Sequence, residues 1–112
     1  MRTTNLLILR GRVGQAPKPF GKTAKVNVAT DRSWTDRDGK RQDETDWVTV
    51  SLLNEKVAAW ALAHVGRGDA VYAECRVADG SYKKGSETVY TTDIVANVFH
   101  KLDVGPRSDV DA

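Results

Sequence analysis

The sequence has 112 residues and a net charge of +2, which is enough chain for one domain and too little for two. Its single cysteine excludes an intrachain disulfide, and one cysteine with two histidines falls short of the about four ligands of a structural zinc site. No apolar run approaches bilayer length, and no signal-type apolar core follows M-R-T-T-N. We therefore expect a cytoplasmic protein that uses no metal, no other cofactor and no membrane.

The charges are unevenly distributed along the chain. Residues 1–42 carry ten Lys or Arg against three Asp, whereas residues 43–112 carry seven against twelve acidic residues. Such asymmetry is typical of a protein with a polyanionic partner on one face. Chance clustering on a solvated surface is the simpler explanation when charge is considered alone.

The first predicted strand covers residues 5–14, N-L-L-I-L-R-G-R-V-G. Its apolar run from Leu6 to Leu9 occupies both faces, although a half-buried strand should alternate. Either a second chain or the protein's own loops cover the extra face. Residues 16–21, A-P-K-P-F-G, then predict a loop, because two prolines and a glycine end the strand.

A second strand is predicted over residues 23–34, followed by a hairpin arm and a third strand over residues 44–53. Asp38-Gly39 within the arm favours a tight turn with positive φ. In the third strand, Val48, Val50 and Leu52 form the natural core face. Trp47 and Leu53 then lie on the outer face.

One helix is predicted over residues 54–66, with Asn54 as its N-cap and Gly66 at its end. Trp60 falls on the apolar stripe and is most simply a packing residue, and His64 is a helix-edge residue. Two further strands follow over residues 69–77 and 88–100. A polar hairpin, residues 78–87, joins them.

This order of elements predicts an all-β domain over residues 1–102, a five-stranded OB-fold Greek-key barrel. One helix lies between strands three and four, and extended hairpin arms project from the barrel. Such barrels bind oligonucleotides or oligosaccharides on an outer face. Residues 103–112 predict a short polar tail, which we expect to be disordered.

Trp34 and Trp47 are predicted at the two roots of the first arm, which carries Arg37, Lys40 and Arg41. Exposed aromatic rings beside cations form a platform on which unpaired bases stack, at ~1–3 kcal/mol per base, while the cations neutralise phosphates. Sugars also stack on aromatic rings but gain nothing from positive charge. The alternative is that both indoles pack beneath the arm as a local cluster.

Several stretches, taken together and in this order, resemble the bacterial-type single-stranded DNA-binding proteins (SSB family). They are N-L-L-I-L-R-G-R-V-G, V-A-T-D-R-S-W-T-D-R-D-G-K, E-T-D-W-V-T-V-S-L-L, R-G-D-A-V-Y-A-E and Y-T-T-D-I-V-A, within residues 5–99. The resemblance implies an OB-fold that binds single-stranded DNA without sequence preference. It also implies self-association, usually as a homotetramer.

The resemblance places Trp34 and Trp47 on base-stacking positions, Leu53 where a stacking phenylalanine is common, and Tyr82 near a further aromatic position. Leu53 offers apolar contact but cannot stack. The cations expected to approach phosphates, from the arm and from the resemblance, are Arg32, Arg37, Lys40, Arg41, Lys56, Arg67, Lys83 and Lys84.

The family usually continues into a long tail that ends in an acidic tip with Pro-Phe, whereas this sequence ends in D-V-D-A. The resemblance therefore leaves recruitment of replication and repair proteins open. The rival function is that of a primosome-type OB protein, a dimer that mainly bridges replication proteins and binds DNA weakly.

An enzyme is not expected, because the chain has no phosphate-binding G-x-x-x-x-G-K-[ST] loop and no supported Cys–His or Ser–His arrangement. Asp43, Glu44 and Asp46 cluster near a hairpin base, as in a metal-dependent nuclease. Solvated charge is the simpler explanation for this cluster.

Overall fold

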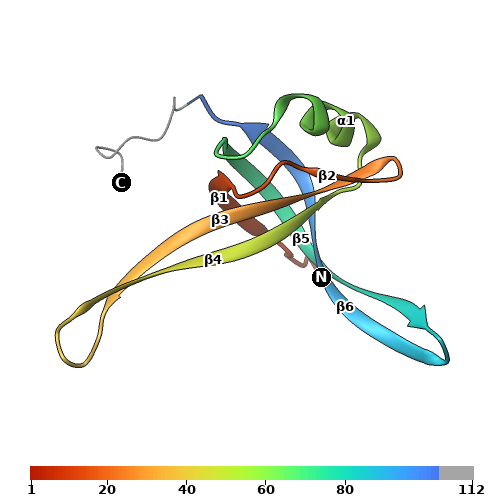
Figure 1. Ribbon diagram of the computed structural model, residues 1–112. Coiled ribbons are helices and arrows are strands. Elements are labelled where there is room, and N and C mark those ends of the chain that lie inside the picture. Colours follow the sequence, from red (N-terminus) through yellow and green to blue (C-terminus); the bar gives the residue numbers. More distant parts are fainter. Residues whose placement is uncertain (104–112) are drawn as a thin grey trace.

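The computed structural model describes residues 1–103, which fold into a β-barrel with two projecting hairpin arms and one helix (Figure 1). In chain order the elements are β1 (Leu7–Val13), β2 (Lys18–Phe20), β3 (Thr23–Thr35), β4 (Arg41–Leu52), α1 (Glu55–His64), β5 (Ala70–Lys84) and β6 (Glu87–Lys101). The predicted polar tail lies, apart from its first residue, outside the described residues.

The barrel closes because β1 pairs with two different strands. The strands follow the order β1-β5-β6-β4-β3, and β1 also pairs with β3 at Arg12↔Ala29 and Val13↔Val28. All neighbours are antiparallel except β4 and β6, which pair in parallel at Val50↔Ile94 and Ser51↔Val95. The predicted five-stranded barrel with one helix is thus confirmed, and the short β2 adds to the free edge of β3.

The barrel interior is filled by small aliphatic side chains that alternate along each strand. On β3 and β4, the fully buried residues are Ala24, Val26, Val28, Val50 and Leu52. β1 adds Leu9 and Val13, while β5 adds Val71, Ala73 and Cys75. The predicted valine face of the third strand is therefore the core face, although Val48 is only partly buried.

Helix α1 closes one end of the barrel. Its predicted cap is confirmed, since the Oδ1 atom of Asn54 accepts hydrogen bonds from the backbone N–H groups of Lys56 and Val57. The helix ends at His64, two residues before the predicted Gly66. It buries Ala58 and Ala61, and these small residues let its backbone approach the barrel.

Both arms are longer two-stranded ribbons than the hydrophobic pattern indicated. β4 begins at Arg41 rather than at residue 44. In the second arm, β5 extends to Lys84 and β6 begins at Glu87, so strand pairing continues through most of the predicted polar hairpin. The Cα radius of gyration is 16.5 Å, against about 13 Å for a compact domain of this length. The arms account for the difference, because they project beyond the barrel (Figure 1).

The turns of the arms follow the expected chemistry. Gly39 has φ +78°, and the Asp36 carboxylate accepts hydrogen bonds from the N–H groups of Asp38 and Lys40. Hydrogen bonds from Lys40, then Gln42, hold the pKa of Asp36 below its ordinary value. Gly85 has φ +65° in the other turn. Glycine is favoured at both positions because it adopts positive φ without steric cost.

The predicted loop over residues 16–21 was wrong in part, because it contains strand β2. Lys18, Pro19 and Phe20 pair with Lys25, Ala24 and Thr23. Proline is tolerated here because β2 is an edge strand. Within residues 1–103, no helix is long and apolar enough to span a membrane, and no cluster of His, Cys, Asp and Glu is suited to a metal ion.

Candidate nucleic-acid interface

Trp47 lies on the outer face of β4 with 59% of its surface exposed. Its indole rests on Gly14, where a Cβ atom would come within 2.2 Å of the ring atom Cζ3. Gly14 is held in turn by a hydrogen bond of 2.9 Å from its N–H to the carbonyl of Asn27. The ring is therefore seated on backbone at one side and open to solvent at the other.

The outer face between Trp47 and β2 is lined by cations and an aromatic ring. The cross-strand partners Ala29↔Trp47, Asn27↔Thr49 and Lys25↔Ser51 place one row of side chains along it. A groove of about 200 Å³ lies at its far end, lined by Gln15, Ala16, Lys18, Phe20, Lys25, Asn27 and Thr49. Phe20 is 52% exposed, and the Nζ atom of Lys25 lies 4.9 Å from its ring centroid.

The same face carries acids on the other side of Trp47, along the first arm. Asp31 accepts a hydrogen bond from Thr45, and the Asp43 carboxylate accepts hydrogen bonds from Ser33 at 2.6 Å and Arg41 at 3.2 Å. These bonds, the Ser33 hydroxyl first, hold the pKa of Asp43 below its ordinary value. This part of the outer face is a closed network of hydrogen bonds and ion pairs.

Trp34 does not share a platform with Trp47. It pairs with Gln42, five residues further along the ribbon than the Ala29↔Trp47 pair, a separation of about 17 Å. Because successive side chains alternate between faces and the register is continuous, the two indoles lie on opposite faces. The prediction that both stand at the roots of the arm is therefore wrong for Trp34, which lies near the tip.

One side of the Trp34 indole is covered by Arg32. The guanidinium carbon lies 4.7 Å from the ring centroid, and the same group forms ion pairs with Glu44 and, at 2.9 Å, Asp46. Trp34 keeps 41% of its surface exposed. Any planar ligand would therefore have to reach this ring from the uncovered side or after Arg32 moves away.

The first arm as a whole is acidic rather than cationic. Residues 31–46 contain four Lys or Arg and six Asp or Glu. Folding pairs Arg32 and Arg41 with carboxylates, whereas Arg37 and Lys40 remain exposed at the turn without ion pairs in the described part of the chain. The excess of positive charge in residues 1–42 therefore does not make a cationic arm.

The second arm presents aromatic and basic side chains. Tyr82 and the adjacent Lys83 and Lys84 are exposed on β5. Tyr90 of β6 is 80% exposed and pairs with Ser81, which puts it on the face opposite Tyr82. Leu53 is exposed directly after β4. Tyr82, Tyr90 and Leu53 therefore do not form one surface with Trp47. Trp47 differs from them because its ring rests against the barrel backbone at Gly14.

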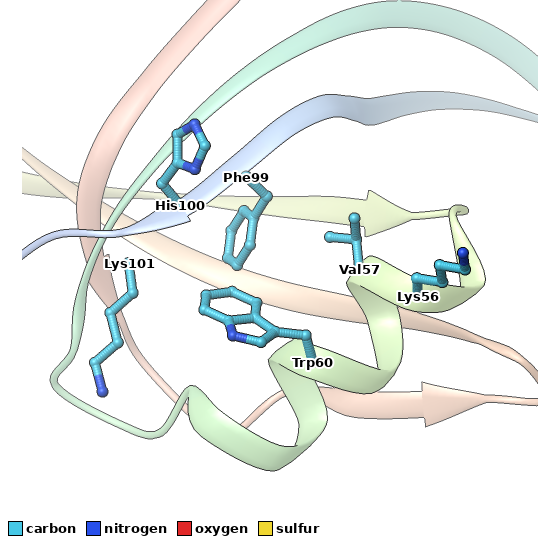
Figure 2. Close-up of a pocket in the computed structure, with 6 residues that line it drawn as sticks. All are labelled: Lys56, Val57, Trp60, Phe99, His100 and Lys101. Carbon is cyan, nitrogen blue, oxygen red and sulfur yellow. The ribbon is translucent and has the colours of Figure 1, made fainter.

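Lys56 and Arg67 lie at the two ends of the helical region. Lys56 borders a hollow of about 370 Å³ that Val57, Trp60 and Phe99 line, and Figure 2 shows its side chain directed away from the indole. Trp60 meets Phe99 edge to face with 6.4 Å between ring centroids, so it packs as predicted, but only in part, because 37% of its surface stays exposed. Arg67 is exposed in the loop before β5.

Four residues of the outer surface were missed by sequence reasoning. Gly14 gave no signal, because its contact with Trp47 joins residues far apart in the chain. Lys18 and Phe20 were passed over because the two prolines favoured a loop, whereas Lys25 lay in the predicted second strand and was not singled out as a site residue. Lys18 and Phe20, one residue apart on either side of Pro19, fit the two-residue alternation of a short edge strand, and this pattern could have indicated β2.

Comparisons with known proteins agree with this architecture. Proteins named single-stranded DNA-binding protein from two serogroups of Neisseria meningitidis are 38% identical over 106 positions, covering 88% of this chain and 59% of theirs. The chain thus spans about three-fifths of their length. The Plasmodium falciparum SSB in complex with ssDNA superposes with a TM-score of 0.76 at 22% identity, over 92% of this chain and 98% of that one.

The wild-type single-stranded DNA binding protein from Thermus aquaticus superposes with a TM-score of 0.72 at 18% identity, over 93% of this chain and 52% of that one. These likenesses concern the fold. Residues 4–102, almost all of the described chain, match the model of one family. This chain therefore belongs to the single-strand binding protein family.

Proposed function

We propose that this protein binds single-stranded DNA without sequence preference and protects it during replication, recombination or repair. The observation that carries the proposal is the indole of Trp47, seated on Gly14 and open to solvent on the outer face of the barrel. Every base offers a flat face to such a ring, so stacking does not depend on sequence. Duplex DNA is a poor ligand, because paired bases hide their faces.

Further base contacts are assigned to Trp34 and Tyr82, with apolar contact from Leu53. The cations that form no ion pair with a carboxylate of residues 1–103 supply the phosphate contacts most directly; they are Arg37, Lys40, Lys56, Arg67, Lys83 and Lys84. Arg32 and Arg41 reach phosphate only by leaving the acids they are paired with. Their contribution to binding is therefore the smallest of the set.

Titration with oligo-dT, followed by tryptophan fluorescence, tests the proposal. Quenching is expected with the single strand and not with a duplex of the same length. The logarithm of the binding constant should fall with the logarithm of the salt concentration, by about 0.7 for each phosphate neutralised. Absence of quenching, together with absence of a shift in a gel, would refute single-strand binding.

Self-association is proposed on the outer face of β1. Ile8 of β1 and Leu6, directly before the strand, are exposed, and the partner of Ile8 across the ladder is Glu74 of β5. Exposed aliphatic side chains side by side favour burial by a second copy. We propose a homotetramer in the cytoplasm, bound to nucleoid DNA. Mass in solution, with and without oligo-dT, tests this: a dimer that binds DNA weakly would favour the primosome-type bridging role instead.

A further inference from the structure

The outer face on which Trp47 stands changes its charge at that residue. Toward the tip of the first arm, the charged side chains on this face are Asp31, Asp43 and Arg41, so the two acids outnumber the one cation, which is already paired with Asp43. Toward β2 they are Thr49, Asn27 and Lys25, and within the described chain no acid lines the groove beyond them. A polyanion held at Trp47 therefore meets repulsion in one direction and attraction in the other.

The groove at the β2 end holds two like charges directly opposite each other. Lys18 and Lys25 are cross-strand partners in the β2–β3 ladder, and neither forms an ion pair with any residue of the described chain. Like charges in this position destabilise a sheet. An anion between them removes that repulsion, so the pair indicates a ligand with negative charge.

Phe20 places an aromatic ring beside these lysines. The Phe20↔Thr23 and Lys18↔Lys25 pairs put Phe20 on the same face as Trp47, six residues away along β3, or about 20 Å. One ring at each end, with polar and cationic side chains between them, matches the alternation of flat bases and charged phosphates in a single strand.

We propose that Lys18, Phe20 and Lys25 form a second nucleotide-binding subsite, so that a DNA strand stacked on Trp47 runs toward β2 rather than along the outer face of the first arm. This inference rests on the proposed single-strand binding and assigns the path of the strand. A base stacks on Phe20, and the Lys25 ammonium, which now lies over that ring, moves to the adjoining phosphate. The exchange is favourable because an exposed cation–π contact is weaker than base stacking.

The ring of Phe20 is tested by Phe20→Ala and Phe20→Tyr, with anisotropy of a labelled oligo-dT of about 15 nucleotides, within the length that one OB-fold contacts. Phe20→Ala should weaken binding on the order of 10-fold, and Phe20→Tyr should keep the affinity of the wild type. Because Phe20 is half exposed on a three-residue edge strand, its loss should leave the fold intact.

The outcomes separate this inference from the proposed function. If Trp47→Ala weakens binding while Phe20→Ala binds like the wild type, the subsite is refuted and single-strand binding stands. If the wild type does not bind oligo-dT, both fail. A change in the mass of the DNA-free protein on Phe20→Ala would also overturn the subsite, because it would assign the ring to a contact between subunits.

Removing one lysine of the pair should have opposite effects on stability and on DNA binding. Lys18→Gln removes the repulsion from Lys25, so the melting temperature of the free protein should rise by about 1–4 °C. The same change should weaken DNA binding and reduce the salt slope by about 0.7. Lys22→Gln is the matched control, since Lys22 is exposed nearby but does not line the groove. Equal effects of the two substitutions on the slope would overturn the subsite.

Discussion

Replacing Gly14 by alanine should weaken DNA binding without weakening the fold. The new Cβ atom would lie 2.2 Å from Cζ3 of Trp47, so the indole must move by about 1.3 Å or more to reach van der Waals distance. Gly14 does not have a positive φ, so alanine fits its backbone. The substitution therefore displaces the ring and leaves the backbone after β1 unstrained.

The loss of DNA affinity on Gly14→Ala cannot exceed the loss caused by removing the Trp47 ring. Trp47→Ala removes one stacking interaction of ~1–3 kcal/mol. Gly14→Ala should cost a part of that amount, while stability to denaturant stays equal or rises by about 0.4–1 kcal/mol from the less flexible unfolded chain. Anisotropy of a labelled oligo-dT measures the binding, and a red shift of tryptophan emission reports the displaced indole.

A double variant decides whether Gly14 acts through Trp47. If it does, Gly14→Ala adds nothing once Trp47 is alanine, because the two changes remove the same interaction. Additive losses would refute the seating of the ring on Gly14. Gly66→Ala is the control, since a Cβ atom there meets only an Asp69 oxygen at 4.0 Å, and it should leave binding unchanged.

Three further results are expected. Asn54→Ala should lower the free energy of unfolding by about 1 kcal/mol through loss of the helix cap, with DNA affinity unchanged, as denaturant titration and anisotropy would show. The carboxylate of Asp43 should titrate by NMR below its ordinary pKa of 3.8. Its stabilisation of the arm is present above that pH and is lost as the pH falls through the lower folded pKa. A titration midpoint at or above 3.8 would contradict the hydrogen bonds to this carboxylate. Arg37→Gln should reduce the salt slope of DNA binding by about 0.7, whereas Arg32→Gln should reduce it less, because Arg32 is already paired with acids; the reverse order would contradict the role given to those ion pairs.

The barrel was predictable from sequence because one face of each of its strands is buried. The alternation of Val48, Val50 and Leu52 with Trp47 placed the indole on the outer face, where the structure has it. The cap at Asn54 and the turn at Gly39 were predictable because each depends on local hydrogen bonds or on a single dihedral angle. Local chemistry of this kind needs no knowledge of distant residues.

The arms were harder to predict because both faces of a two-stranded ribbon are solvated. Without a buried face the hydrophobic pattern stops, while the backbone ladder continues to Thr35↔Arg41 in one arm and Lys84↔Glu87 in the other. The charge of the first arm also depends on register. The cation excess counted over residues 1–42 ignored the acids of the returning strand, and the Arg32↔Glu44 pairing shows that folding brings those acids against the arm's cations.

Because the ladder of the first arm is continuous, inserting residues in both of its strands changes the arm's length and the face on which Trp34 lies. One extra residue in each strand between Trp47 and Trp34 would lengthen the arm, leave every barrel contact in place, and turn Trp34 onto the side that Trp47 occupies. A second pair would turn it back. Related chains whose arms differ by an odd number of such pairs should therefore alternate between two-sided and one-sided displays of these indoles, with no change in the barrel that carries them.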